Sequence, residues 1–305
     1  MRALAVTAIP AVDWARHERP VRHGLILAGL VFAAGTVASM LATGQSDIHS
    51  YWIASPAHAY GGYVLGGEGQ AYTPVWTMGF GPLTALPFPL VYAAWLALNF
   101  ATVVWLLRPL PLRWVVPGIA IVSPELLNGN VHLLIAASLV LGLTGRGGAW
   151  AFPLLTKVTP GLGIVWHLVR GERRGLSFAV ATTGALVAVS LLLAPGLWVS
   201  WWLAMTRNAW THGPELLWVP LWPRLPLAFA AAVYAARTDR AWLVPVAVLL
   251  ALPHIDLQGF AVLAAVPRLR NEHRQSAQPS YARRLHLPYS AARAWASQAS
   301  ASAGR

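Results

Sequence analysis

The stretch "GLILAGLVFAAGTVASMLATGQSDIHS", residues 24–50, decides the fold of this protein. Its first part, residues 24–43, contains no charged side chain. A helix needs roughly 20 apolar residues to cross the hydrocarbon core of a bilayer. The run is also longer than the apolar segment of a cleaved secretory signal usually is, so that alternative is the less favoured one. We therefore expect an uncleaved first membrane helix that ends a few residues before the carboxylate of Asp47.

The composition extends this interpretation to the whole chain. Hydrophobic residues make up 57% of the 305 residues and charged residues only 10%, whereas about 25% of a typical soluble domain is charged. The formal net charge is +12. The arginines lie mostly in short connections and near the C-terminal end, where membrane topology rather than nucleic-acid binding explains them. We expect an all-α polytopic membrane protein, and the absence of cysteine excludes disulfides and thiolate metal sites.

Apolar runs and helix breakers predict about ten membrane spans, and counts of nine or eleven stay open. The expected spans are residues 24–43, 74–88, 90–107, 113–126, 129–144, 149–170, 176–194, 225–237, 241–253 and 255–267. Several are shorter than the usual minimum of about 17 residues, which is tolerated where helices line a cavity enclosed by protein.

Charge sets the expected orientation of a transmembrane domain that covers residues 24–267. Arginine-rich flanks stay in the cytoplasm, so we expect residues 1–23 and the basic turn 170–175 to be cytoplasmic. Residues 44–73 and 195–224 then form outer loops. The tail, residues 268–305, is basic and rich in Ser, Ala and Gln, and we expect it to be cytoplasmic and disordered.

Asp47 is the first candidate for chemistry, because it lies where the first span meets the outer surface. It is either a solvated residue that ends the span or a carboxylate that faces a cavity. In a cavity it could accept a proton from a hydroxyl nucleophile, as a general base does. Tyr51 follows one helical turn later and would share its face. Trp52 and Tyr72 add aromatic surfaces that suit a membrane interface and also the apolar face of a sugar.

Lys157 is the only lysine of the chain, and it interrupts the apolar stretch of residues 149–169. An ammonium at the centre of a span costs roughly 3 kcal/mol on insertion scales. Pro160 and Gly161 follow it, and they break a helix and free backbone groups. A snorkelling lysine or a structural ion pair is the ordinary interpretation. We favour an anionic partner, for which a phosphate group is well suited.

Two further polar elements interrupt apolar runs. The first is "NGN", residues 128–130, which Glu125 precedes and His132 follows; it is either a plain turn or a functional intramembrane site. The second is "LPHIDLQGF", residues 252–260, which contains His254 and Asp256. That pair is either a proton-transfer pair, a phosphate contact or an ordinary polar turn. The chain has no zinc-protease motif, no phosphate-binding P-loop and no serine-hydrolase elbow.

The order of these features resembles glycosyltransferase family 87, the polyprenol-phosphate-mannose-dependent mannosyltransferases with the GT-C membrane fold. The resemblance covers residues 24–270 and consists of an acid after the first span, a Tyr-x-Pro, a Gly-polar element, a Lys-x-x-Pro and a late histidine. The matching residues are Asp47, Tyr51, Trp52, Tyr72, Pro74, Gly129, Asn130, Lys157, Pro160 and His254. Two positions depart from the pattern, because Thr73 replaces a usual proline and Asn130 a usual glutamine.

The resemblance implies an enzyme that transfers a hexose, with mannose as the expected sugar, from a polyprenyl phosphate to a glycolipid or glycan acceptor. The reaction would invert the anomeric centre at the outer face of the plasma membrane, in the synthesis of envelope lipoglycans, without a metal or other cofactor. Asp47 would be the catalytic base, and Lys157 and His254 would bind the donor phosphate. The expected substrate-binding residues are Tyr51, Trp52, Tyr72, Asn130 and Asp256. The alternatives are a polytopic transporter or lipid flippase, which uses similar broken helices, and a non-catalytic membrane subunit.

Overall fold

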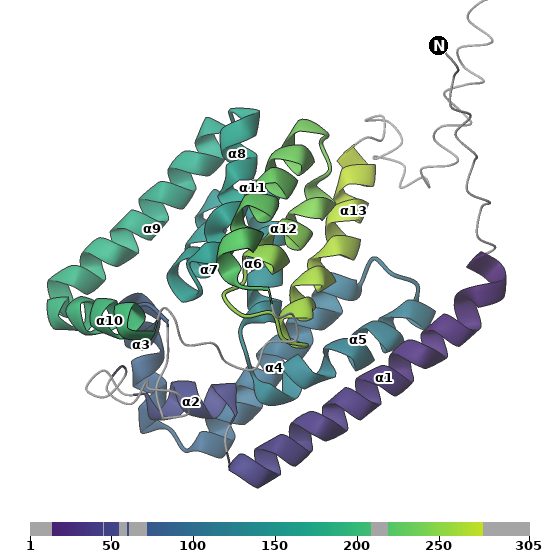
Figure 1. Ribbon diagram of the computed structural model, residues 1–305, viewed down its shortest axis with the longest axis horizontal. Helices are drawn as coiled ribbons and strands as arrows, with labels where there is room; N and C mark the ends of the chain where they lie inside the picture. The colour runs from purple at the N-terminus through teal and green to yellow at the C-terminus, as the bar shows by residue number, and fades with distance from the viewer. Residues whose placement is uncertain (1–13, 45, 55–59, 61–71, 209–218, 277–305) are drawn as a thin grey trace, which may run out of the picture.

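The described part of the chain is a bundle of helices. The computed structural model describes residues 14–44, 46–54, 60, 72–208 and 219–276, and every regular element in these ranges is helical. The predicted all-α class is therefore confirmed. In Figure 1, α1 (Trp14–Thr43) runs along one side of the bundle, and α2 (Asp47–Ile53) and α3 (Pro74–Phe80) lie at the end opposite α8 (Val165–Arg170).

Short 3-10 helices separate many of the α-helices. The remaining α-helices are α4 (Phe88–Leu107), α5 (Leu112–Asn128), α6 (His132–Leu143), α7 (Ala151–Thr156), α9 (Arg173–Leu193), α10 (Pro195–Asn208), α11 (Leu221–Arg237), α12 (Val244–Ala251) and α13 (Ala265–Ser276). The 3-10 helices are η1 (Gly81–Ala85), η2 (Gly147–Trp150), η3 (Thr159–Ile164), η4 (Ala241–Leu243) and η5 (Gly259–Ala264).

The number of spans differs from the prediction. In the described residues, three segments are long and apolar enough to cross a membrane, namely His17–Ile53, which contains α1, and the helices α4 and α9. Helices α5 and α6 meet at a bend of 117° and would together form a fourth. This is fewer than the ten spans expected from apolar runs. The expected span 149–170, for example, divides into η2, α7, η3 and α8, because proline and glycine interrupt helical hydrogen bonding there.

Two expected loop regions also contain helix. The expected outer loop 195–224 includes α10 and the start of α11, and the expected loop 44–73 includes α2. Helix α13 continues to Ser276, into the segment expected to be a disordered tail. The residues from 277 onward, residues 1–13, and most of the loop between 55 and 71 lie outside the described residues.

Helix α1 packs closely against α5. A Cβ atom at Gly29 would lie 2.2 Å from the carbonyl oxygen of Ala120, so only glycine lets the two backbones approach this far. Small residues at such crossings are typical of helix pairs in membranes. Leu27, Leu30 and Leu41 of α1 are exposed, and an apolar surface of this kind suits contact with lipid tails.

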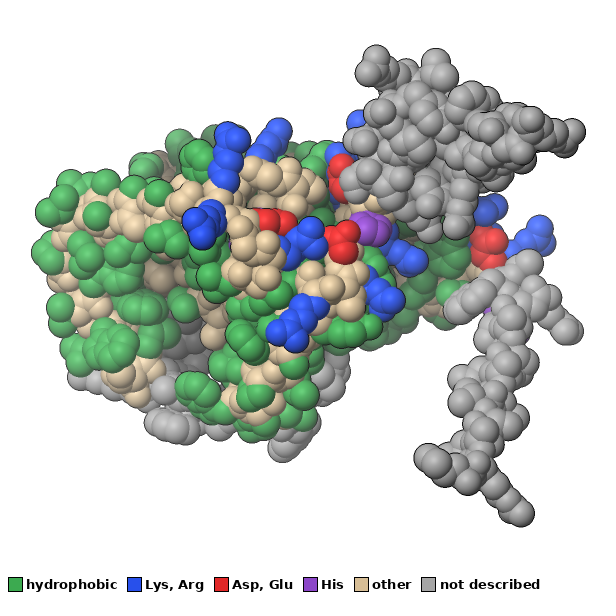
Figure 2. Space-filling view, turned by 90° about the horizontal axis from the view of Figure 1, so that it is seen from above, with side chains coloured by type: hydrophobic (Ala, Val, Ile, Leu, Met, Phe, Trp, Pro, Cys, Tyr) green, Lys and Arg blue, Asp and Glu red, His purple; other side chains and the backbone are tan. Residues whose placement is uncertain are grey.

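Basic side chains gather at one end of the bundle. Figure 2 shows Lys and Arg side chains on the face seen from above, which is the end that α8 and α11 reach in Figure 1. Arg170 is central to this end, because its guanidinium contacts Glu172 and Asp239, at 2.7 Å each. Nη1 of Arg268 donates to the Trp105 carbonyl oxygen at 3.2 Å, which ties the end of α4 to α13.

A buried histidine belongs to the same end. The indole N–H of Trp150 donates to His167 Nε2 at 2.9 Å, so Nδ1 carries the proton and donates to Glu172 at 2.8 Å. Partial burial alone would raise the pKa of Glu172, but hydrogen bonds from Arg170 and His167 lower it below its ordinary value. The network fastens α8 to the start of α9.

Candidate functional site

Asp47 stands at the start of a short helix that its neighbour caps. Helix α1 ends at Thr43, and the chain turns through Gly44, whose φ is +69°. The hydroxyl oxygen of Ser46 then accepts a hydrogen bond from the His49 N–H at 3.2 Å, which caps α2. This local structure fixes Asp47 as the first residue of α2, half-buried at the edge of the core.

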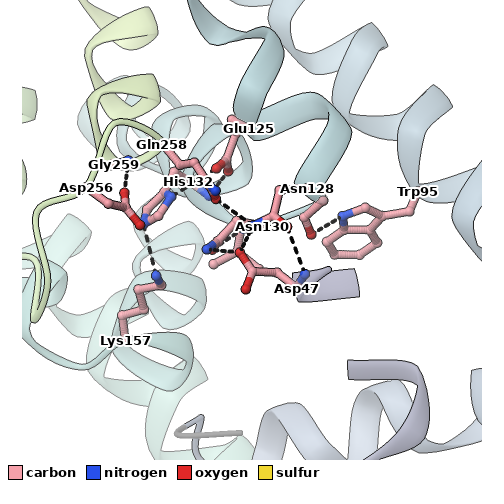
Figure 3. A network of polar contacts seen from close by, with 12 residues as sticks. Asp47, Trp95, Glu125, Asn128, Asn130, His132, Lys157, Asp256, Gln258 and Gly259 are labelled. Carbon is pink, nitrogen blue, oxygen red and sulfur yellow. Dashed lines mark hydrogen bonds and ion pairs between the residues drawn. The ribbon is translucent and has the colours of Figure 1, made fainter. Parts of the chain in front are cut away.

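Two side-chain amides hold one oxygen of the Asp47 carboxylate (Figure 3). Asn128 Nδ2 and Asn130 Nδ2 donate to Asp47 Oδ2 at 2.5 and 2.6 Å. Asn128 Nδ2 also donates to Gln258 Oε1 at 2.8 Å, which connects the site to the segment before η5. The other oxygen, Asp47 Oδ1, accepts no hydrogen bond from the residues that the structure describes. The carboxylate is therefore oriented through Oδ2, and Oδ1 is open to a proton.

The bend between α5 and α6 places both asparagines. Gly129 ends α5 in the left-handed region with φ of +75°, and a Cβ atom there would lie 2.7 Å from Ile48 Cβ. Glycine is thus required by both backbone conformation and space. The indole N–H of Trp95 donates to the Gly129 carbonyl oxygen at 2.7 Å, which fixes the turn. The chain direction changes so sharply that Asn128 and Asn130 both reach Asp47.

Two tyrosines determine how the Asn130 amide is oriented. Its Oδ1 accepts from the Val131 N–H at 2.7 Å and from the hydroxyl groups of Tyr51 and Tyr72 at 3.4 and 3.3 Å. A backbone N–H can only donate, so the carbonyl side of the amide faces Val131 and the NH₂ side faces Asp47. The two tyrosine hydroxyls lie 2.7 Å apart. Tyr51 and Tyr72 thus support the orientation of Asp47 through Asn130.

The segment that carries Tyr72 is tied down on both sides. The hydroxyl of Tyr60 donates to the Tyr72 carbonyl oxygen at 2.9 Å, and burial raises the pKa of Tyr60 to about 12, so it keeps its proton. The hydroxyl of Thr73 donates to the Leu155 carbonyl oxygen on α7. Thr73, which departs from the family pattern, therefore provides a hydrogen bond that proline could not.

Lys157 follows α7 and precedes a strained turn. Val158 has φ of +57° and ψ of −66°, and the Thr159 N–H donates to the Lys157 carbonyl oxygen at 2.7 Å. This is a γ-turn with positive φ, a rare conformation for a β-branched residue. Such strain costs about 1–3 kcal/mol and tends to occur at functional sites. The turn interrupts the helix and directs the lysine into the bundle.

The direct polar contact of the Lys157 ammonium is with a histidine. Its Nζ is 2.9 Å from His132 Nε2 and 5.8 Å from the ring centroid of Tyr72. No ion pair joins Lys157 to an acidic residue in the ranges that the structure describes, so a structural ion pair is not its role there. Since Tyr72 also contacts Asn130, the ammonium belongs to the same polar network as Asp47.

Glu125 and His132 complete this network from the two sides of the α5–α6 bend. Glu125 Oε1 accepts from the backbone N–H of His132 at 2.6 Å, and Oε2 lies 3.1 Å from His132 Nδ1. Both side chains are buried. Asp256 lies next to His132 in Figure 3, and its Oδ1 accepts from the Gly259 N–H at 2.6 Å. Asp256 is therefore at the edge of the network.

Arg224 shapes the segment between α12 and η5. Its guanidinium is buried and donates to the carbonyl oxygens of Leu250, Leu252 and Pro253 at 3.0, 2.9 and 3.0 Å. These bonds fix the chain just before Asp256 and Gln258. The sequence had given no reason to connect an arginine at the start of α11 with this segment.

Most, but not all, of the predicted site residues come together. Asp47, Tyr51, Tyr72, Asn130 and Lys157 form one network of contacts. Trp52 points elsewhere, since its indole N–H donates to the Leu86 carbonyl oxygen at 2.9 Å and its ring packs on Phe88. The His254 side chain is exposed, and its role at the donor phosphate stays a prediction. The histidine beside Lys157 is His132.

Sequence reasoning did not assign roles to Asn128, Gln258 or the Glu125–His132 pair. The signal was present, because these residues lie in the two polar interruptions, residues 125–132 and 252–260. The sequence pattern did not show which of these side chains point into the bundle. Only the left-handed Gly129 and the bonds of Arg224 decide which of their side chains turn inward.

An apolar groove adjoins the polar network. It has a volume of about 240 Å³ and is lined by Leu83, Leu86, Leu90, Val91, Ala94, Trp95 and Leu98. Trp95 contributes to both places, since its ring lines the groove and its N–H contacts Gly129. The described residues contain no group of three or more His, Cys, Asp or Glu side chains that could hold a metal ion.

Comparison with known proteins identifies the family. The sequence profile of glycosyltransferase family 87 matches residues 71–282, which include Tyr72, Asn130 and Lys157, whereas Asp47 precedes the match. No curated protein and no solved structure matches the chain. The family match covers more than half of the sequence and agrees with the apolar helices of the structure. The protein therefore belongs to glycosyltransferase family 87 and is a membrane glycosyltransferase.

Proposed function

We propose that this protein transfers a hexose, with mannose as the first candidate, from a polyprenyl phosphate to a hydroxyl group of a glycolipid or glycan. Asp47 Oδ1 accepts the proton of the acceptor hydroxyl, whose oxygen forms a bond to the anomeric carbon. The bond between that carbon and the phosphate oxygen breaks, and its electron pair leaves with the polyprenyl phosphate. Attack opposite the leaving group inverts the anomeric configuration.

The observation that carries this proposal is the pairing of an oriented acid with a cation that forms no direct ion pair with an acidic residue of the described chain. Oδ2 of Asp47 is held by two amides, so Oδ1 is the oxygen available to a hydroxyl within hydrogen-bond reach. Lys157 is connected to the same asparagine through Tyr72. A fixed cation stabilises the negative charge that develops on a leaving phosphate.

The groove beside Trp95 supports a lipid-borne donor. Its lining is almost entirely apolar, and the aromatic ring of Trp95 separates it from the turn that holds the asparagines. An isoprenoid chain needs such a surface, while its phosphate needs the polar network next to it. The combination favours an amphiphilic donor over a nucleotide sugar.

Charge supports an extracytoplasmic site at the plasma membrane. Arginines concentrate at the end of the bundle where α8 and α11 meet, and α2 with Asp47 lies at the opposite end (Figure 1). Basic residues favour the cytoplasmic side of membrane proteins. This distribution supports an outer position for Asp47.

Purified protein in lipid nanodiscs tests the proposal directly. We would supply radiolabelled mannosyl, glucosyl and galactosyl polyprenyl phosphates in parallel, together with extracted membrane glycolipids, and measure new glycosides. We expect one sugar to be transferred, and we expect Asp47→Asn and Lys157→Met to abolish most of the turnover. The matched control is Asp239→Asn, which removes a carboxylate at the other end of the bundle.

Two outcomes would contradict the proposal. The first is transfer by Asp47→Asn at the rate of the wild type, which would exclude Asp47 as the base. The second is movement of the labelled lipid across sealed vesicles without any glycoside, which would favour a flippase. A nucleotide sugar that replaces the lipid donor would refute the donor assignment alone.

A further inference from the structure

Three side chains form a chain of polar contacts that begins at the α5–α6 bend and ends at the Lys157 ammonium, namely Glu125, His132 and Lys157. Glu125 Oε1 accepts a hydrogen bond from the His132 backbone N–H at 2.6 Å, and Oε2 lies 3.1 Å from the ring Nδ1 of His132. The other ring nitrogen, Nε2, lies 2.9 Å from Lys157 Nζ. Glu125 and His132 are 1% exposed each, so water does not replace these contacts.

The protons in this chain follow from the chemistry of the groups. An ammonium only donates hydrogen bonds, so His132 Nε2 must have the lone pair that accepts from Lys157. In the neutral imidazole, Nδ1 then carries the proton and donates to Glu125. An ammonium has three N–H bonds. Only one is used by the residues that the structure describes, so two are available to another acceptor.

We propose that Glu125 and His132 are positioning residues that aim the two remaining N–H bonds of Lys157 at the phosphate of the lipid donor. The inference rests on the proposed function for the identity of that anion. Glu125 sets the ring orientation and the tautomer of His132, and His132 sets the direction of the ammonium. Neither side chain touches the donor itself.

Glu125 also stabilises the start of α6, the helix that carries His132. Its bond to the His132 backbone N–H caps the first turn of α6, which follows directly after Asn128 and Asn130. The same bend therefore presents the amides to Asp47 on one side and the histidine to Lys157 on the other. Figure 3 shows both branches extending from this bend.

Glu125→Gln tests the tautomer without a change of shape. A glutamine still accepts from the His132 backbone N–H through its oxygen, but its NH₂ group donates to Nδ1. The proton then moves to Nε2, where it opposes the ammonium. A hydrogen bond to a charged group contributes about 1.5–3 kcal/mol, so we expect affinity for a prenyl phosphate to fall about 10- to 100-fold.

Two substitutions of His132 separate positioning from a merely structural role. In His132→Gln the carbonyl oxygen lies near the position of Nε2 and still accepts from Lys157. In His132→Asn the shorter amide lies near Nδ1 and retains only the bond to Glu125. Positioning predicts that the Gln variant retains more phosphate affinity than the Asn variant, whereas a structural role predicts the reverse.

The measurement is binding of tritiated farnesyl phosphate to the full-length protein in nanodiscs, with farnesol as the competitor that lacks phosphate. Lys157→Met gives the affinity without the ammonium. Glu172→Gln and His167→Gln are the controls, because they alter another histidine–glutamate pair, in which His167 is buried, Glu172 is partly exposed and the Nδ1–oxygen distance is 2.8 Å. We expect them to bind farnesyl phosphate as the wild type does. Thermal unfolding of every variant identifies those that fail to fold.

The outcomes are distinguishable. Wild-type affinity in both Glu125→Gln and His132→Asn would overturn the inference, as would equal losses in the two His132 variants. A wild type that binds farnesyl phosphate no better than farnesol would overturn both the inference and the proposed function. A wild type with the phosphate preference and the expected variant order, but without sugar transfer, would support the inference and refute the proposed function alone.

Discussion

Replacement of Asp47 by asparagine is the most informative perturbation of this site. The two side chains have the same shape, and the asparagine carbonyl can take the place of Oδ2 between Asn128 and Asn130. Its NH₂ group then occupies the position of Oδ1 and presents a donor where the acceptor hydroxyl needs a base. Binding of the donor lipid is expected to be nearly unchanged, because Lys157 and the groove are not altered.

The magnitude follows from the two roles of the carboxylate. Loss of a general base lowers a rate by typically 10²- to 10⁴-fold, which corresponds to about 2.7–5.4 kcal/mol of activation free energy. Two charge-assisted hydrogen bonds become neutral ones and lose about half of their strength. With a net value near 2 kcal/mol for each charge-assisted bond, the free energy of unfolding falls by about 2 kcal/mol.

The assay is single-turnover transfer from the labelled donor, with kcat and the donor KM measured separately and unfolding followed by tryptophan fluorescence. We expect a large decrease in kcat with a donor KM close to that of the wild type. A rate within about threefold of the wild type would refute the assignment of Asp47. A loss of activity that merely follows a loss of folded protein would refute the argument that Oδ1 acts as the base.

Three further perturbations test the surroundings of the site. Val158→Gly should relieve the positive-φ strain and raise the free energy of unfolding by about 1 kcal/mol after the entropy cost of glycine. The donor KM should rise, because Lys157 is held less rigidly. An unchanged KM would contradict this prediction. Gly129→Ala should lower the free energy of unfolding by about 2–4 kcal/mol, because of its backbone conformation and its clash with Ile48. Gly171→Ala is the control, since its Cβ atom meets open space at a similar φ. It should lower the free energy of unfolding, measured with a chemical denaturant, by only about 1 kcal/mol. The pKa of Glu172 is lower in the folded state, so its stabilising contribution is present at neutral pH and is lost as the pH falls below about 4.5. The free energy of unfolding of Glu172→Gln should therefore depend less on pH in that range. Identical pH profiles of the variant and the wild type would rule this out.

The helical class and the first span could be predicted because they depend only on the length and apolarity of a run. The same argument predicted about ten spans, whereas three or four segments of the described residues are long and apolar enough to cross a membrane. It treats each apolar stretch as one helix, while prolines and glycines divide the stretch around Lys157 into pieces of six residues or fewer. An apolar run in a bundle can be buried as several short helices, and composition does not distinguish the two cases.

The acid and the lysine could be predicted as functional because an ionisable group in an apolar context is costly. Their partners could not. Glu125 and Asn128 lie at the end of α5 and Gln258 lies in the turn before η5. The direction of their side chains depends on the left-handed Gly129 and on backbone carbonyl groups held by Arg224. Conversely, Trp52 satisfies the family pattern, yet its indole N–H pairs with Leu86.

The bond between Asn128 and Gln258 has a consequence for biosynthesis. The two residues are 130 positions apart, and Asn128 is 81 positions from Asp47. Helix α6, with 12 residues, is about 18 Å long and cannot bridge a hydrocarbon layer of about 30 Å without neighbours made later. In a nascent chain that inserts into the membrane, Asp47 and the two asparagines that hold it are therefore synthesised well before Gln258, the residue that links Asn128 to the segment before η5.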